Sequence, residues 1–72
     1  MKLTEKEQWL YDSVKRGMDA PGSGWLHELS RADWSNRTAA GVLSALIRKG
    51  LVTSHMEPGA GYKCYWIELI ST

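Results

Sequence analysis

Two arginines and the small residues between them are the part of this 72-residue chain best suited to chemistry. If residues 34–51 hold a helix, four side chains fall within about 60° of arc on one side: Arg37, Gly41, Ser44 and Arg48. The two guanidinium groups would lie about 16 Å apart. Their planar forks of N–H donors match phosphate oxygens and the edge of guanine, and short side chains between them permit close approach. Alternatively, Gly41 and Ser44 are merely tolerated on a solvated surface, where Gly costs about 1 kcal/mol relative to Ala.

A helix over about residues 36–49 must position these side chains. Ser35 precedes it as an N-cap whose hydroxyl can accept from an amide of the first turn. Gly50 stands where helices commonly end, after the positive charges of Arg48 and Lys49. We assign the apolar side of this helix to the core: Ala39, Val42, Leu43, Leu46 and Ile47.

Composition and charge limit the classes of protein to which the chain can belong. With 43% hydrophobic and 24% charged residues, it is expected to form one globular domain. Its net charge of +1 provides no overall attraction to nucleic acid, so DNA binding would need a local cluster of positive charge. A single cysteine, Cys64, excludes an intrachain disulfide and a Cys-x-x-Cys zinc site, and it fits a reducing compartment. Because no signal peptide or membrane-length apolar run is evident, we expect a cytoplasmic protein.

A first helix is expected over about residues 4–18. Thr4 and Glu7 have the spacing of a capping box at its start. Apolar residues recur at helical spacing and would form its buried side: Leu10, Tyr11, Val14 and Met18. The glycine-rich loop at 20–24 is interpreted as a connector, because it lacks the Gly-Lys-Ser/Thr sequence of a phosphate-binding loop.

A very short strand and a second helix are expected next. The strand would take one or two residues at 25–26, and the helix would run over about residues 26–32 with Leu26 and Leu29 facing inward. Residues 33–35 then form a tight turn, in which Trp34 fills the corner between two helices. A short helix, a tight turn with an apolar residue and a longer helix together make a helix-turn-helix pattern.

After Gly50 the hydrophobic period changes from 3.6 to 2, which predicts a β-hairpin over about residues 51–70 with its turn at 57–61. In the second strand we assign one set of alternating residues to the core: Tyr65, Ile67 and Leu69. The other set would face outward: Cys64, Trp66 and Glu68. Of the four tryptophans, Trp25 and Trp34 are expected to be buried, whereas Trp9 and Trp66 could belong to the core or to an interface.

This α+β order of elements resembles the winged helix-turn-helix family of bacterial and phage regulators, including the multiple-antibiotic-resistance type. The family architecture has three helices, a C-terminal β-hairpin wing and a very short strand between helices one and two. The local resemblance rests on Leu29, the Trp34-Ser35 turn, Val42, Leu46 and the Arg-Lys-Gly-Leu-Val junction at 48–52. It covers the chain from about residue 3 to residue 69.

The resemblance implies a small prokaryotic or phage transcriptional regulator that inserts helix 36–49 into the major groove of double-stranded DNA. Arg37 would contact guanine, with Asn36 and Thr38 reaching bases or phosphates beside it. The whole implied DNA-binding set is Arg31, Ser35, Asn36, Arg37, Thr38, Ala40, Gly41, Ser44, Arg48 and Lys63. Four members of this set would contact phosphates: Ser35, Arg48, Arg31 on helix two and Lys63 near the hairpin tip. The small residues would permit close approach.

The chain departs from the family in two respects. The expected hairpin turn carries Glu57 and neither Arg nor Lys, which argues against base reading by the wing. No long helix of the kind that forms the family's dimer is expected within these 72 residues, so tight sequence-specific binding would need self-association, a partner or cooperative neighbours.

Two other function classes compete with DNA binding. A winged helix that binds a protein partner is favoured by the near-neutral charge, the acidic wing and four tryptophans, because Trp is enriched at interface hot spots. An enzyme is not expected, since nothing pairs a nucleophile with a base. His55 could face Cys64 across the hairpin, but in a domain without a deep pocket such a thiol–imidazole pair is interpreted as a coincidence and not as a catalytic arrangement. His27 lacks a second metal ligand four residues on. No cofactor, metal or small-molecule substrate is predicted.

Overall fold

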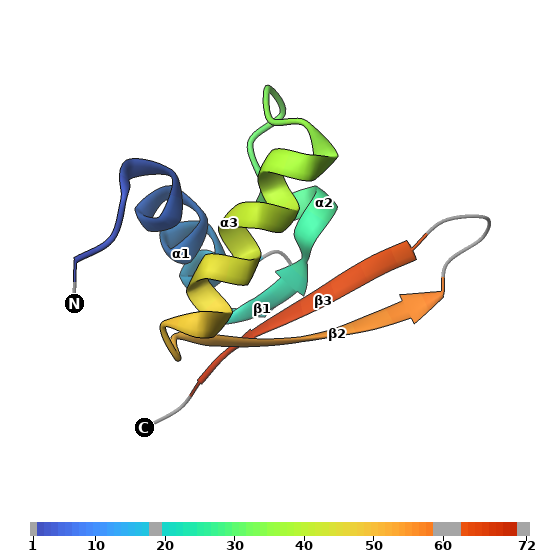
Figure 1. Cartoon of the computed structure of the whole chain (residues 1–72). Helices are drawn as coiled ribbons and strands as arrows, with labels where there is room; N and C mark the ends of the chain where they lie inside the picture. The colour runs from blue at the N-terminus through green and yellow to red at the C-terminus, as the bar shows by residue number, and fades with distance from the viewer. Residues whose placement is uncertain (1, 18–19, 59–62, 71–72) are drawn as a thin grey trace.

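The computed structural model describes residues 2–17, 20–58 and 63–70, and for residues 57, 58 and 63 it describes the backbone alone (Figure 1). This part of the chain is α+β, as predicted, with three α-helices and a three-stranded antiparallel sheet. The elements are α1 (Glu5–Arg16), β1 (Ser23–Trp25), α2 (Leu26–Leu29), α3 (Asn36–Arg48), β2 (Val52–Pro58) and β3 (Lys63–Leu69). This order is compatible with a winged-helix arrangement. The predicted burial of Met18 lies outside the described residues, as does the rest of the turn predicted at 57–61, but its first two residues, Glu57 and Pro58, belong to strand β2 instead.

The predicted capping box at the start of α1 is confirmed. The Thr4 amide donates to the Glu7 carboxylate at 3.0 Å, and the Glu7 amide donates to the Thr4 hydroxyl at 3.2 Å. The helix ends at Arg16, two residues before the expected end, because the next residue, Gly17, has a φ of 69° that no helix can continue. α1 is therefore fixed at its first turn and stopped by a glycine at its last.

α2 is a single turn that ends at Leu29, three residues before the predicted end. The Leu29 carbonyl accepts a hydrogen bond from the buried Ser13 hydroxyl at 2.7 Å, in the place where another helical turn would have supplied an amide. A turn follows, closed by the Trp34 amide on the Arg31 carbonyl at 3.1 Å. The connection from α2 to α3 is thus residues 30–35 instead of a three-residue turn, and Arg31 lies on this connection, not on a helix.

The core forms where the inner sides of the helices meet one face of the sheet. Its buried members are Leu10, Val14, Leu26, Leu29, Ala39, Val42, Leu43, Leu46, Val52 and Ile67. Leu69 and Tyr11 pack against it half-buried, so the predicted burial of Tyr11 is confirmed only in part. Gly24 lets β1 pass close to α2, since a Cβ there would lie 2.8 Å from the Leu29 side chain.

Two residues that we assigned to the core lie at the surface instead. Ile47 is 43% exposed and Tyr65 is 36% exposed. Tyr65 does share a sheet face with buried Ile67, as predicted, but the hairpin extends beyond the helices and no helix covers its outer half (Figure 1). Cys64, which we placed on the outward face, is buried with 9% of its surface exposed.

The four tryptophans form two edge-to-face pairs, and each ring is half-buried. Trp9 and Trp34 have ring centroids 5.4 Å apart, and those of Trp25 and Trp66 are 4.8 Å apart. The predicted burial of Trp25 and Trp34 is therefore wrong in degree, because each ring is covered partly by its partner and partly left in solvent. None of the helices in the described residues combines the length and the apolar character needed to cross a lipid bilayer.

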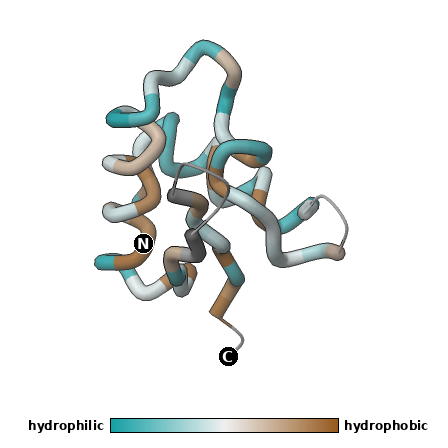
Figure 2. The backbone as a smooth tube through the Cα atoms, turned by 90° about the vertical axis from the view of Figure 1, so that its right-hand side faces the viewer, coloured by the Kyte–Doolittle hydropathy of each residue, from teal (hydrophilic) through white to brown (hydrophobic). Residues whose placement is uncertain are grey.

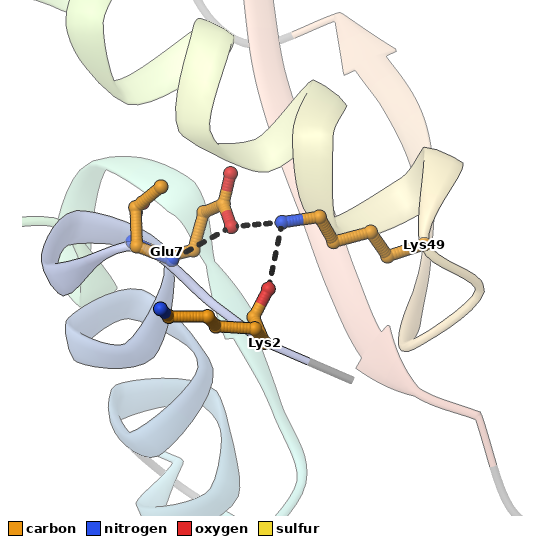
Figure 3. A network of polar contacts seen from close by, with 4 residues as sticks. Lys2, Glu7 and Lys49 are labelled. Atoms are coloured by element: carbon orange, nitrogen blue, oxygen red, sulfur yellow. Dashed lines mark hydrogen bonds and ion pairs between the residues drawn. The ribbon is translucent and has the colours of Figure 1, made fainter.

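An ion pair ties the start of α1 to the end of α3 (Figure 3). The Lys49 ammonium group donates to the Glu7 carboxylate and also to the Lys2 carbonyl, the latter at 3.4 Å. Glu7 is buried, with 9% of its surface exposed. The hydrogen bond from Lys49, followed by the one from the Thr4 amide, holds the pKa of Glu7 below its usual range.

Glu7→Gln is expected to lower stability at pH 7, because glutamine keeps the capping box but loses the charge that Lys49 needs. The lowered pKa means that the native state favours the carboxylate, so this stabilisation is full above about pH 5 and is lost as the pH falls through the native pKa. Urea unfolding of wild type and Glu7→Gln should therefore differ at pH 7 and converge in acid. Glu5→Gln removes an exposed charge from the same turn and is the control. An equal difference at pH 7 and pH 3 would contradict this account.

Candidate nucleic-acid interface

The N-terminus of α3 is fixed by the cap that the sequence predicted. The Ser35 hydroxyl accepts a hydrogen bond from the Thr38 amide at 3.1 Å and donates to the Thr38 hydroxyl at 3.0 Å. The Ala39 amide donates to the Ser35 carbonyl at 3.0 Å and begins the helical hydrogen-bond ladder. These bonds leave the amides of Asn36 and Arg37 without an acceptor within the described residues.

α3 ends at Arg48, one residue before the predicted end, and Gly50 follows the C-cap residue as the predicted stop. Gly50 has a φ of 75°, and its amide donates to the Ile47 carbonyl at 3.0 Å. The Leu51 amide donates to the Leu46 carbonyl at 3.1 Å, which completes a Schellman motif. Both ends of α3 are therefore determined by local side-chain and backbone chemistry, and its rotation about its own axis is set by the core that it covers.

The outward side of α3 carries the predicted row of side chains. All four of its members are exposed: Arg37, Gly41, Ser44 and Arg48. We call these four residues the arginine row. A Cβ built on Gly41 would have no atom within 4 Å, so the middle of the row opens directly onto solvent. Figure 2 shows strongly hydrophilic colour at the two ends of α3 and paler or hydrophobic colour between them. Asn36 and Ala40 are exposed beside the row, and Thr38 is half-buried.

The cations of the predicted site differ in how they are engaged. Neither Arg37 nor Arg48 forms a hydrogen bond or an ion pair with any described residue. Arg31, by contrast, holds Asp33 with two hydrogen bonds of 2.9 and 3.1 Å, and its guanidinium carbon lies 5.9 Å from the centre of the Trp9 ring. Lys63 is the first residue of β3, and its side chain lies outside the described part. Among the cations of the set whose side chains are described, the two ends of the arginine row are therefore available, while Arg31 is already paired.

A groove between α3 and the hairpin was not predicted from the sequence. It has a volume of about 300 Å³ and is lined by Ala40, Leu43, Ser44, Ile47, Ser54, His55, Met56 and Tyr65. A second hollow of about 440 Å³, toward α2, shares Ala40 and Tyr65 with this groove. Three large apolar side chains at this groove are exposed: Ile47, Met56 and Tyr65. The alternation of β2 places Met56 on the same sheet face as Val52, which is the sequence signal that could have identified one wall.

The residues considered from the sequence for catalysis or metal binding are Cys64, His55 and His27. In the register of the hairpin His55 lies opposite Trp66, and Cys64 lies opposite Glu57, so the thiol and the imidazole are not direct neighbours across the strands. His27 stacks beside the Trp25 ring, with centroids 6.3 Å apart. Over residues 2–17, 20–58 and 63–70, no three His, Cys, Asp or Glu side chains gather as metal ligands would.

Comparisons of the chain with protein-family models, with curated proteins and with solved structures each found no match. Any statement about family or function therefore depends on the residues and geometry of this chain. The resemblance to winged helix-turn-helix regulators stays a prediction on that basis.

Gly41→Ala is expected to stabilise the domain by about 0.5–1 kcal/mol, because alanine loses less backbone entropy in a helix and its methyl group would meet no neighbour. Urea unfolding followed by circular dichroism measures this difference. Gly24→Ala is the matched control and should destabilise, since its Cβ would press on the Leu29 side chain. A destabilised Gly41→Ala variant would show that the middle of the arginine row is not open.

Proposed function

We propose that this chain is a DNA-binding module of the winged helix-turn-helix kind that places α3 in the major groove of double-stranded DNA. The observation that carries the proposal is the arginine row. Arg37 and Arg48 are exposed at its two ends without a partner in the described residues, and only small residues separate them. On exposed helix faces such charges are often paired with acids three or four residues along the helix, and α3 itself contains no acidic residue. Two unpaired forks about 16 Å apart suit the phosphates and guanine edges of a duplex.

The N-terminal turn of α3 would provide the base contacts and one phosphate site. Arg37 is the residue proposed to reach guanine, with exposed Asn36 beside it. Because the Ser35 cap uses the Thr38 amide, the amides of Asn36 and Arg37 remain to bind a phosphate oxygen at the positive end of the helix. Ser35 thus contributes to phosphate binding by capping the helix, and half-buried Thr38 contributes by donating its amide to that cap.

The rest of the proposed contacts would orient the duplex. Arg48 at the far end of the row binds a backbone phosphate, and Ala40, Gly41 and Ser44 let the helix approach the groove floor. Arg31 can join only by giving up its bonds to Asp33, so we assign it a secondary role. In this function the chain would act as a small prokaryotic or phage transcriptional regulator.

A second candidate function is a winged helix that binds a partner protein, and the groove beside α3 favours it. Exposed Ile47, Met56 and Tyr65 gather there, as apolar anchors do at protein interfaces. Trp9 and Trp66, which we considered as anchors from the sequence, are instead engaged in ring pairs within the chain. Because Ala40 and Ser44 belong to both the groove and the outward side of α3, the two functions would compete for the same surface.

Arg37→Ala and Arg48→Ala are both expected to weaken binding to DNA duplexes, measured by fluorescence anisotropy over a range of salt concentrations. Arg48→Ala should weaken all sequences alike and reduce the slope of log Kd against log salt by about 0.9. Arg37→Ala should cost about 1–3 kcal/mol on the preferred sequence selected from a random pool, and less on others.

Arg16→Ala is the control, because it removes an exposed arginine from the end of α1. If the wild type binds DNA and all three variants bind as tightly, α3 is not the DNA-binding element. If the wild type does not bind at low salt, the protein-interaction function takes its place, and Tyr65→Ser should then abolish capture of the partner.

A further inference from the structure

β2 is an edge strand with one side open along its length. In the sheet order β1-β3-β2 it pairs only with β3, and α3 is the one other described element that it contacts. Figure 1 shows β2 at the border of the sheet, with no element beyond it. An open strand edge offers unpaired N–H and C=O groups to another chain.

The hydrogen bonds at the base of the hairpin show which groups of β2 point outward. The Ile70 amide donates to the Leu51 carbonyl at 3.2 Å, so residues 51, 53, 55 and 57 direct their backbone groups toward β3. Their neighbours, residues 52, 54, 56 and 58, must direct theirs toward the open edge. A second hydrogen bond supports this assignment. Leu69, which lies opposite Val52, donates its amide to the Gly22 carbonyl on the side of β3 that faces away from β2.

The side chains along this edge favour contact with another chain. Met56 is 51% exposed and lies at the groove with Ile47, which is 43% exposed. The Ser54 hydroxyl is buried and has no hydrogen-bond partner in the described part of the chain. β2 is Val-Thr-Ser-His-Met-Glu-Pro: its first five residues include no Lys, Asp, Glu or Pro, and the residue types that commonly protect a free edge occur only at its last two positions, Glu57 and Pro58.

We propose that two copies of this chain associate by pairing their β2 strands antiparallel, about a two-fold axis that passes through His55 and is normal to the sheet. In this register outward-directed residues meet each other, with Ser54 opposite the partner's Met56 and Val52 opposite the partner's Pro58. It overlaps all seven residues of β2 and forms about six hydrogen bonds, since Pro58 lacks an amide. Any other register with the same alternation overlaps fewer residues of the strand.

The pairing would change the surface in a defined way. It brings the partner's Met56 beside Ser54 at the wall of the groove, which reduces the exposure of Met56 and Ile47. Because the axis is normal to a continuous sheet, both α3 helices lie on the same side of it. The dimer does not rest on DNA binding, but it would present two arginine rows in one direction if the proposed function holds.

Disulfide trapping tests the pairing and its register in the absence of DNA. The background is Cys64→Ser, which removes the chain's one cysteine. At the two-fold axis His55 faces its own copy in a non-hydrogen-bonded pair, with Cα atoms about 4.5 Å apart, so His55→Cys should form a disulfide-linked dimer rapidly. Thr53→Cys is the control on the same strand and face, where the two copies would lie about 14 Å apart.

We expect His55→Cys to cross-link at least tenfold faster than Thr53→Cys at about 100 µM protein under mild oxidation. In sedimentation equilibrium the unmodified chain should dimerise, and exposed Met56→Lys should raise the dimer Kd at least tenfold by placing a charge at the edge. Equal cross-linking rates for the two cysteine variants would overturn the register. An unmodified chain that stays monomeric up to about 1 mM would overturn the pairing itself, and neither result depends on whether the chain binds DNA.

Discussion

The burial of one side of α3 is the constraint on which the rest of the structure depends. Leu46 and Leu43 on that side are almost fully removed from water and pack in one cluster with Leu10 of α1 and Ile67 of β3. A helix has a period of 3.6 residues, so fixing its buried side also fixes which residues face solvent. The arginine row is outward because the leucines are inward, and the Lys49–Glu7 pair prevents the end of the helix from moving away from α1.

Interactions between residues close in sequence made the helix ends and the exposed side of α3 predictable. Ser35 and Gly50 identified both ends of α3, and the Thr4 and Glu7 pair identified the start of α1, because caps are satisfied by residues within one turn. The exposed row followed from the helical period alone. These features need no knowledge of which segments meet in space, and all of them were confirmed.

Features that depend on contacts distant in sequence were not predicted. The α2 helix ends at Leu29 because Ser30 is extended, and its last carbonyl accepts from Ser13, sixteen residues earlier. Tyr65 lies on the expected face but is exposed because α3 does not reach the outer half of the hairpin, and Ile47 is exposed at the edge of the same groove. The pairing of Arg31 with Asp33 is a local exception, two residues apart, and was not predicted because Arg31 was expected on a helix and not on a turn. The groove was not predicted because it forms between α3 and the hairpin, and its shape depends on how these elements pack against each other.

We propose that α3 meets duplex DNA through its arginine row, and an NMR titration of the labelled domain tests this proposal most directly. A short duplex of mixed sequence would be added at low salt and again at about 0.2 M salt. The account predicts amide shifts that concentrate on residues 35–48 and weaken at the higher salt, as expected for contacts to phosphates. Shifts confined to other surfaces, or no shifts at low salt, would contradict it.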